Sequence, residues 1–152
     1  MIPAPCFCGA LFFMSQETIL KKIQERCANT FVDTLNIRFV EVGEDYLVAK
    51  MPVTPAVLQL DGVLHGGATA GLAETVGSAA CAIFRGADDI MIRGIEVSAN
   101  HVRGVRSGHV YAKAVAVHMG RTMQLWQISI TDDDDKLVSS CKLTTLSLPR
   151  NK

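Results

Sequence analysis

A long apolar segment, residues 66–84, restricts what this chain can fold into more than any other feature. It consists almost entirely of Ala, Gly, Leu, Val and small polar residues, and its length favours a buried helix over a strand. Four of its residues are glycines that would each weaken an exposed helix by about 1 kcal/mol relative to Ala: Gly66, Gly67, Gly71 and Gly77. We therefore predict a central helix that other elements approach closely and wrap around.

Segments with strand character flank this helix on both sides. Ser15 as an N-cap and an apolar stripe predict one further, amphipathic helix over residues 16–28. Short turn-forming stretches separate the strands, so antiparallel meanders are expected. The predicted strands cover residues 34–42 and 46–53 before the central helix and residues 91–103, 108–119, 122–131 and 136–148 after it. This order predicts an α+β fold in which an antiparallel β-sheet packs against one buried helix.

The length and the charge of the chain limit its class. A chain of 152 residues is near the size of a single domain, which we place at residues 15–150. Lys plus Arg and Asp plus Glu each number 15, so no net field attracts nucleic acid or an anionic membrane. Residues 1–14 lack the basic start and long apolar core of a signal peptide. We expect them to form a disordered extension, with Met14 as an alternative start.

The five cysteines and the acidic run at residues 132–135 predict neither a disulfide framework nor a metal site. The cysteines form an odd set without zinc-type spacing, which fits a reducing cytoplasm. The acidic run lacks the spaced ligands and terminal Glu of a calcium loop, so we interpret it as a solvated hairpin turn. We expect no metal and no bound cofactor.

The tripeptide His65-Gly66-Gly67 ends a loop and begins the predicted central helix. Free backbone N–H groups and the positive end of the helix dipole converge at such a position. Two glycines also let a substrate carbonyl approach the backbone without meeting a Cβ atom. These are the properties of an oxyanion hole. The alternative interpretation is a tight turn in which His65 only caps the helix.

Glu74 is the one acidic side chain between Asp61 and Asp88, and it lies in the middle of an otherwise small and apolar helix. An unpaired carboxylate in such a setting costs several kcal/mol. It therefore needs either a bonding partner or a catalytic task. Ser78 follows one helical turn later on the same face and is placed to orient the carboxylate or a water molecule. The alternative interpretation is a purely structural Glu satisfied by its neighbours.

The spacing between Gly66 and Glu74 adds a constraint. Eight residues of helix separate them by about 12 Å, too far for both to contact one reacting carbon. Two antiparallel copies of the helix across a two-fold axis would bring Glu74 of one chain opposite Gly66 of the other. We therefore expect a homo-oligomer with composite sites.

The stretch from Gln59 to Ala80 resembles the signature of a known family: Gln, then His-Gly-Gly, then Glu on the same helix. The order of the later segments agrees with this, so that residues 28–148 are covered. The chain is similar to hotdog-fold thioesterases of the phenylacetate-pathway type. It resembles especially the branch with Glu that includes enterobactin proofreading, dihydroxynaphthoyl-CoA and hydroxybenzoyl-CoA thioesterases. The resemblance implies a hotdog fold, an antiparallel sheet wrapped around a long central helix.

The resemblance also implies roles for the residues at the matching positions. The Gly66 N–H would polarise a thioester carbonyl, Gln59 and His65 would support the acyl group, and Glu74 of the facing subunit would act as general base or nucleophile. The expected activity is acyl-CoA thioester hydrolysis, with CoA as part of the substrate and product, in a dimer or a tetramer of two dimers. The family's CoA-binding positions correspond to Gly67, His101, Arg103, Arg106, Gly120, Arg121 and Thr122.

One departure from the family pattern is Arg103-Gly104, where relatives often carry Arg-Pro.

Three other classes of protein are alternative interpretations of the sequence. An α/β-hydrolase would need a Gly-x-Ser-x-Gly elbow, which the sequence lacks, and a hotdog dehydratase would need a different pairing of His and acid. A non-catalytic hotdog module that binds acyl-CoA remains the main alternative.

Overall fold

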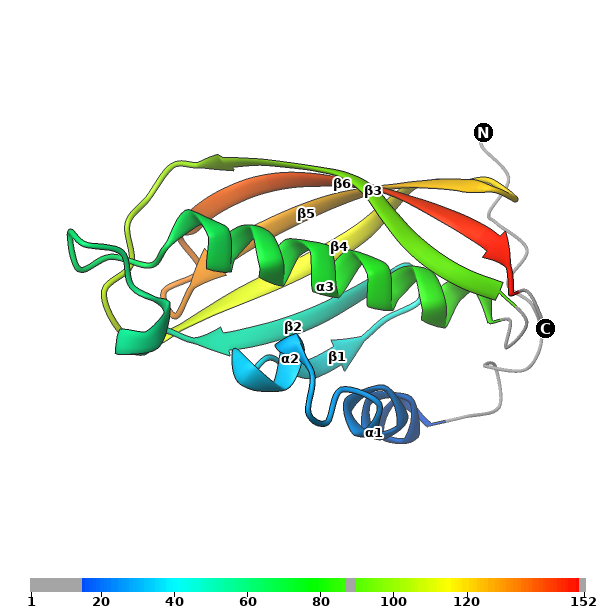
Figure 1. Cartoon of the computed structure of the whole chain (residues 1–152), viewed down its shortest axis with the longest axis horizontal. Coiled ribbons are helices and arrows are strands. Elements are labelled where there is room, and N and C mark those ends of the chain that lie inside the picture. The colour runs from blue at the N-terminus through cyan, green and yellow to red at the C-terminus, as the bar shows by residue number, and fades with distance from the viewer. Residues whose placement is uncertain (1–14, 87–89, 151–152) are drawn as a thin grey trace.

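The structure, a computed structural model, describes residues 15–86 and 90–150. One antiparallel sheet curves around a long helix, α3 (Gly66–Arg85), which lies across the strands in Figure 1. The fold is the predicted hotdog fold. The expected extension, residues 1–14, lies outside the described residues.

The central helix α3 matches the predicted segment closely. His65 is its N-cap, and Gly86 ends it in the left-handed conformation at φ 58°. Eight of its residues are buried, so although α3 has the length and composition to cross a membrane, it is a core helix here. A Cβ on Gly77 would lie 2.5 Å from the Leu143 side chain, so a glycine at this position lets the sheet approach the helix. The prediction of a closely wrapped helix is confirmed.

Six strands form the sheet in the order β1-β2-β4-β5-β6-β3, and all neighbours are antiparallel. Inward-facing side chains of the central strands form the core, and Gln124, Trp126, Ile128 and Ile130 are at most 1% exposed. The strands are β1 (Arg38–Val42), β2 (Tyr46–Pro52), β3 (Ile90–His101), β4 (His109–Met119), β5 (Met123–Asp132) and β6 (Leu137–Pro149).

The expected meander is wrong for β3, which pairs with β6 at the edge of the sheet and not with the following strand β4. The connection between β3 and β4 crosses the end of the sheet, where Val102 and Arg103 donate to Val138 O and Leu64 donates to Val105 O. Seven extended residues reach about 23 Å, and three strand spacings need only about 14 Å. A short connection therefore does not require adjacent strands.

The N-terminal region also differs from the prediction. Helix α1 (Gln16–Glu25) is shorter than expected, and a second helix, α2 (Phe31–Thr34), occupies the predicted start of a strand. The Asn29 N–H bonds the Asp33 carboxylate, and Asn36 adopts φ 53°, so local polar contacts and a left-handed residue favour a turn there. The first strand consequently begins only at Arg38.

Two shorter elements complete the chain. The predicted loop at residues 54–64 contains a 3-10 helix, Pro55–Val57, and closes on a bridge between Leu58 and Leu64. The acidic run is a hairpin turn, as expected, in which the Asp132 carboxylate accepts from the backbone of Asp134 and Lys136.

Candidate active site

The first turn of α3 offers a backbone donor. The His65 Nδ1 atom accepts from Gly67 N at 2.8 Å, and the His65 carbonyl accepts from Ala68 N and Thr69 N. Across residues 15–86 and 90–150, the Gly66 N–H has no hydrogen-bond acceptor. This N–H lies at the positive end of the helix dipole, where developing negative charge is stabilised.

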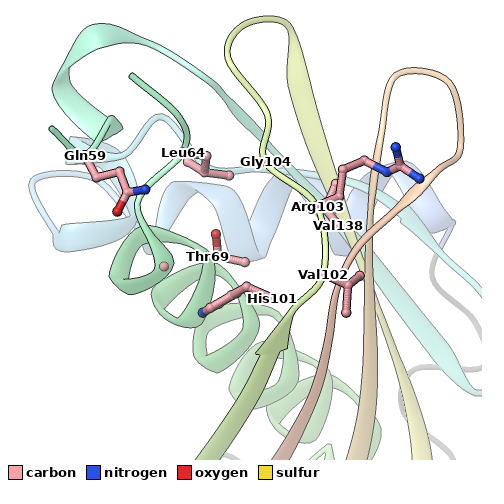
Figure 2. A pocket seen from close by; sticks show the side chains of 9 residues that line it. Gln59, Leu64, Thr69, His101, Val102, Arg103, Gly104 and Val138 are labelled. Atoms are coloured by element: carbon pink, nitrogen blue, oxygen red, sulfur yellow. The ribbon is translucent and has the colours of Figure 1, made fainter. Parts of the chain in front are cut away.

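A cavity of about 420 Å³ lies beside this turn. In Figure 2 the Gln59 amide and the His101 imidazole both lie near the first turn, whereas the Arg103 guanidinium group extends away from it. The lining residues come from the loop before α3, from α3, from the end of β3, from the β3–β4 connection and from β6: Gln59, Leu64, Gly66, Thr69, His101, Val102, Arg103, Gly104 and Val138. The cavity therefore unites four of the predicted site residues: Gln59, Gly66, His101 and Arg103.

His101, at the end of β3, is held against the start of the helix. Its Nδ1 atom lies 3.1 Å from Ser139 Oγ, and this hydroxyl also donates to the Asn100 carbonyl at 3.1 Å. A Cβ on Gly66 would lie 2.9 Å from His101 Nε2. Gly66 therefore leaves room for the imidazole beside the first turn.

The loop that carries Gln59 is fixed from both sides. Gln59 N donates to Val63 O at 2.8 Å, and Gly62 N donates to Gln59 O at 2.9 Å. The Arg106 guanidinium donates to the carbonyls of Asp61 and Gly62 at 3.0 and 3.2 Å. Arg106 thus holds this loop in place, a contact that its predicted CoA-binding role did not anticipate.

Glu74 lies away from this cavity, in the middle of α3. Its side chain is half-buried and packs against Gly94 of β3. Burial raises the pKa of the Glu74 carboxyl above its usual range, and a hydrogen bond with Ser78 opposes part of that shift. Ser78 thus lies close enough to act on the Glu74 carboxyl, and a raised carboxyl pKa is typical of a general base.

The predicted CoA-binding residues fall into two groups within one chain. His101 and Arg103 lie near the start of α3, whereas the turn 120–122 lies near its end, where Arg85 donates to the Arg121 carbonyl at 3.2 Å. A helix of 20 residues spans about 30 Å. One chain therefore does not bring these two groups together.

Some residues at the site were not predicted from the sequence. Thr69 lines the cavity three residues after Gly66, on the same face of the helix, a spacing that sequence reasoning could have used. Ser139 and Gly94 come from strands distant in sequence, and no local pattern indicates that they contact His101 and Glu74.

Comparison with known proteins agrees with this fold. Residues 61–139 match the family model of the thioesterase superfamily. The chain is 40% identical over 125 residues to a putative esterase of Haemophilus influenzae, covering 82% of this chain and 90% of the relative. It is 42% identical over 117 residues to the 1,4-dihydroxy-2-naphthoyl-CoA hydrolase of Escherichia coli, covering 77% and 85%.

A solved structure shows the same architecture. The crystal structure of a thioesterase from Haemophilus influenzae superposes with a TM-score of 0.83 at 38% identity, covering 88% of this chain and 92% of that chain. The chain belongs to the thioesterase superfamily. It is a hotdog-fold thioester hydrolase, as the resemblance implies.

Proposed function

We propose that this enzyme hydrolyses acyl-CoA thioesters at sites shared between two copies of the chain. The observation that carries the proposal is the unpartnered Gly66 N–H, presented beside a cavity at the positive end of α3 within the part of the chain that the structure describes. A thioester carbonyl that accepts this hydrogen bond is polarised, and its developing oxyanion is stabilised.

Glu74 supplies the second half of the reaction in this proposal. With its pKa raised by burial, the carboxylate takes a proton from a water molecule that attacks the thioester carbon. The tetrahedral intermediate then collapses, the carbon–sulfur bond breaks, and the thiolate of CoA leaves with a proton. Direct attack by the carboxylate is the alternative route. We favour the water route, which needs no metal or bound cofactor.

A second copy of the chain is needed because Gly66 and Glu74 are about 12 Å apart along α3. The edge strand β3 supports pairing, since Ile95 and Val97 are 54% and 41% exposed there. A two-fold axis at this edge would run the two helices antiparallel and join Glu74 of one chain to Gly66 of the other. Two such dimers form the tetramer that we propose.

The same arrangement suits a CoA thioester. The relative from Escherichia coli is named for an aryl-CoA substrate, which supports an aryl- or medium-chain acyl group here, on CoA or on an acyl carrier protein. In an antiparallel dimer, the turn 120–122 of one chain approaches the His101 end of the other, so that Arg103 and Arg121 can share the CoA phosphates. We also propose that the enzyme acts on CoA thioesters in the cytoplasm.

The oxyanion donor is tested by replacing Gly66 with Pro. Proline is well tolerated at the first position of a helix, where it removes an N–H that makes no bond within the helix. His65 already has the extended backbone (φ −68°, ψ 133°) that proline requires before it. We expect kcat to fall by about 100- to 1,000-fold in a thiol-release assay on acyl-CoAs. The matched control, Gly66→Ala, adds the same Cβ against His101 but keeps the donor. Equal losses in both variants would assign the effect to His101 and refute the N–H donor.

The shared site is tested by co-expressing two inactive chains, Gly66→Pro and Glu74→Gln. In a mixed dimer, one site carries both substitutions and the other carries neither. Random pairing should therefore restore about one quarter of wild-type activity. Activity that stays at the level of the single variants would show that each chain works alone, as would a fully active monomer in light scattering.

The alternative function is a non-catalytic module that binds acyl-CoA. It predicts saturable binding of acyl-CoAs without release of thiol. The family membership and the half-buried carboxylate both favour the enzyme.

A further inference from the structure

Gly94, on the edge strand β3, lies directly against the carboxylate of Glu74. A Cβ on Gly94 would overlap Glu74 Oε1 and would lie 2.7 Å from Glu74 Cδ and 2.9 Å from Oε2. All three of its nearest contacts are therefore atoms of the carboxyl group. Any side chain at this position would have to displace that group.

The backbone at Gly94 does not itself require glycine. Among the described residues, the glycines with positive φ are Gly62, Gly86 and Gly108, so the conformation of Gly94 is open to any L-amino acid. Glycine is also unfavourable in a strand because of its conformational entropy. Its presence here is accounted for by the space that the carboxylate occupies.

The strand is irregular at the same point. Gly94 pairs with Thr145 of β6, but the next paired residue is Glu96, opposite Thr144, so Ile95 is an extra residue in the ladder. Such a bulge bends an edge strand and changes the direction of its side chains. Figure 1 shows β3 crossing over α3. Gly94 of β3 contacts Glu74 of α3.

We infer that Gly94 is a positioning residue for Glu74. The backbone of Gly94, which carries no Cβ, contacts the Glu74 carboxylate and, together with Ser78, fixes its position. This inference rests on the proposed role of Glu74 in hydrolysis. Ser78 follows Glu74 by one helical turn and acts on its carboxyl, and the Gly94 backbone lies directly against the same group. Gly94 itself does not touch the substrate.

The test is Gly94→Ala, which adds one methyl group where the carboxylate lies. We expect kcat for an acyl-CoA to fall by about 10- to 100-fold with KM nearly unchanged, because a displacement of about 1 Å at a reacting group can cost that much. The matched control is Gly43→Ala. Its new Cβ would also overlap a side chain, that of Tyr46, but in the hairpin between β1 and β2 and not beside Glu74. The control should keep wild-type kcat and KM.

A shorter carboxylate tests the spatial explanation directly. Glu74→Asp withdraws the group by one methylene, which vacates the position that the Gly94→Ala methyl needs. The double variant, Glu74→Asp with Gly94→Ala, should therefore lose less activity than the product of the two single-variant losses. If the losses of the two single variants multiply in the double variant, the two residues act independently and the inferred contact is refuted.

The outcomes separate this inference from the proposed function. A fully active Glu74→Gln enzyme would overturn both. If Glu74→Gln is inactive while Gly94→Ala keeps kcat within twofold of wild type, only the role of Gly94 fails. If Gly94→Ala melts lower but has normal kcat in the folded fraction, Gly94 is structural and the inference is wrong.

Discussion

Two polar side chains at the central helix lie in different surroundings. Glu74 is in the middle of α3, and Gln124 of β5 contacts α3 near its end. Gln124 is completely buried, and its Oε1 atom accepts from Cys81, Thr145 and Ser147. Its Nε2 atom donates to the Gly120 carbonyl at 2.8 Å. Both polar atoms of this amide therefore have hydrogen-bond partners.

The Glu74 carboxylate, in contrast, is half-buried and bonded to Ser78, and burial raises its pKa. A buried polar group with all its bonds made stabilises one arrangement of the core. A carboxylate with spare acceptor capacity and a raised pKa is placed to accept a proton. The comparison predicts that Gln124 matters for stability and Glu74 for turnover.

The largest effect is expected from Glu74→Gln. The substitution keeps shape and bonding capacity but removes the negative charge, so folding should survive while kcat falls by about 100-fold or more. Thiol release and a thermal melt measure the two properties. Normal turnover with an altered melting temperature would reverse the comparison and assign Glu74 a structural role.

A single turnover in heavy-oxygen water, with enzyme in excess, then sharpens the role of Glu74. If the carboxylate activates water, the first acid released carries the heavy oxygen. If the carboxylate attacks directly, it forms a mixed anhydride; water that opens this anhydride at the Glu74 carbon then leaves an unlabelled enzyme oxygen in the first acid. We expect the labelled product.

The opposite pattern is expected for Gln124→Leu. The change removes the acceptor shared by Cys81, Thr145 and Ser147, and each buried donor left unpaired costs about 1–3 kcal/mol. The free energy of unfolding, measured in urea, should fall by at least that amount, with kcat of the folded enzyme retained. An unchanged free energy of unfolding would show that the hydrogen bonds of Gln124 do not stabilise the fold.

A smaller effect is expected at the two ends of α3, where Arg103 and Arg121 lie. Replacing either with Ala should raise KM for CoA thioesters by about tenfold and leave a short pantetheine thioester nearly unaffected. Arg38→Ala, on the distant strand β1, is the control. Equal losses on both substrates would place the arginine outside the CoA-phosphate site.

The smallest effect is expected in the pH dependence. Because burial raises the pKa of Glu74, kcat should fall with decreasing pH through a value above that of an ordinary Glu. The same shift makes ionised Glu74 unfavourable for folding at neutral pH, and this cost disappears as pH falls below the pKa of the unfolded chain. Glu74→Gln should therefore be at least as stable as wild type at neutral pH, with the difference lost in acid. Urea unfolding of both proteins across this range measures it.

The sequence by itself determined the central helix and the residues on it. The small apolar run predicted α3 within one residue of its end, and the positions of Gly66, Glu74 and Ser78 follow from its 3.6-residue period. These features depend on neighbours along the chain, which a sequence displays directly.

Only the tertiary structure decided which distant segments meet. The pairing of β3 with β6, the bond between His101 and Ser139, and the contact of Gly94 with Glu74 join residues far apart in the chain. Local side-chain bonds such as that of Asp33 likewise accompany the helix α2, so that the strand predicted from residue 34 begins only at Arg38. Local patterns report which face of an element is apolar, but a partner across the sheet is selected by the packing of the whole core.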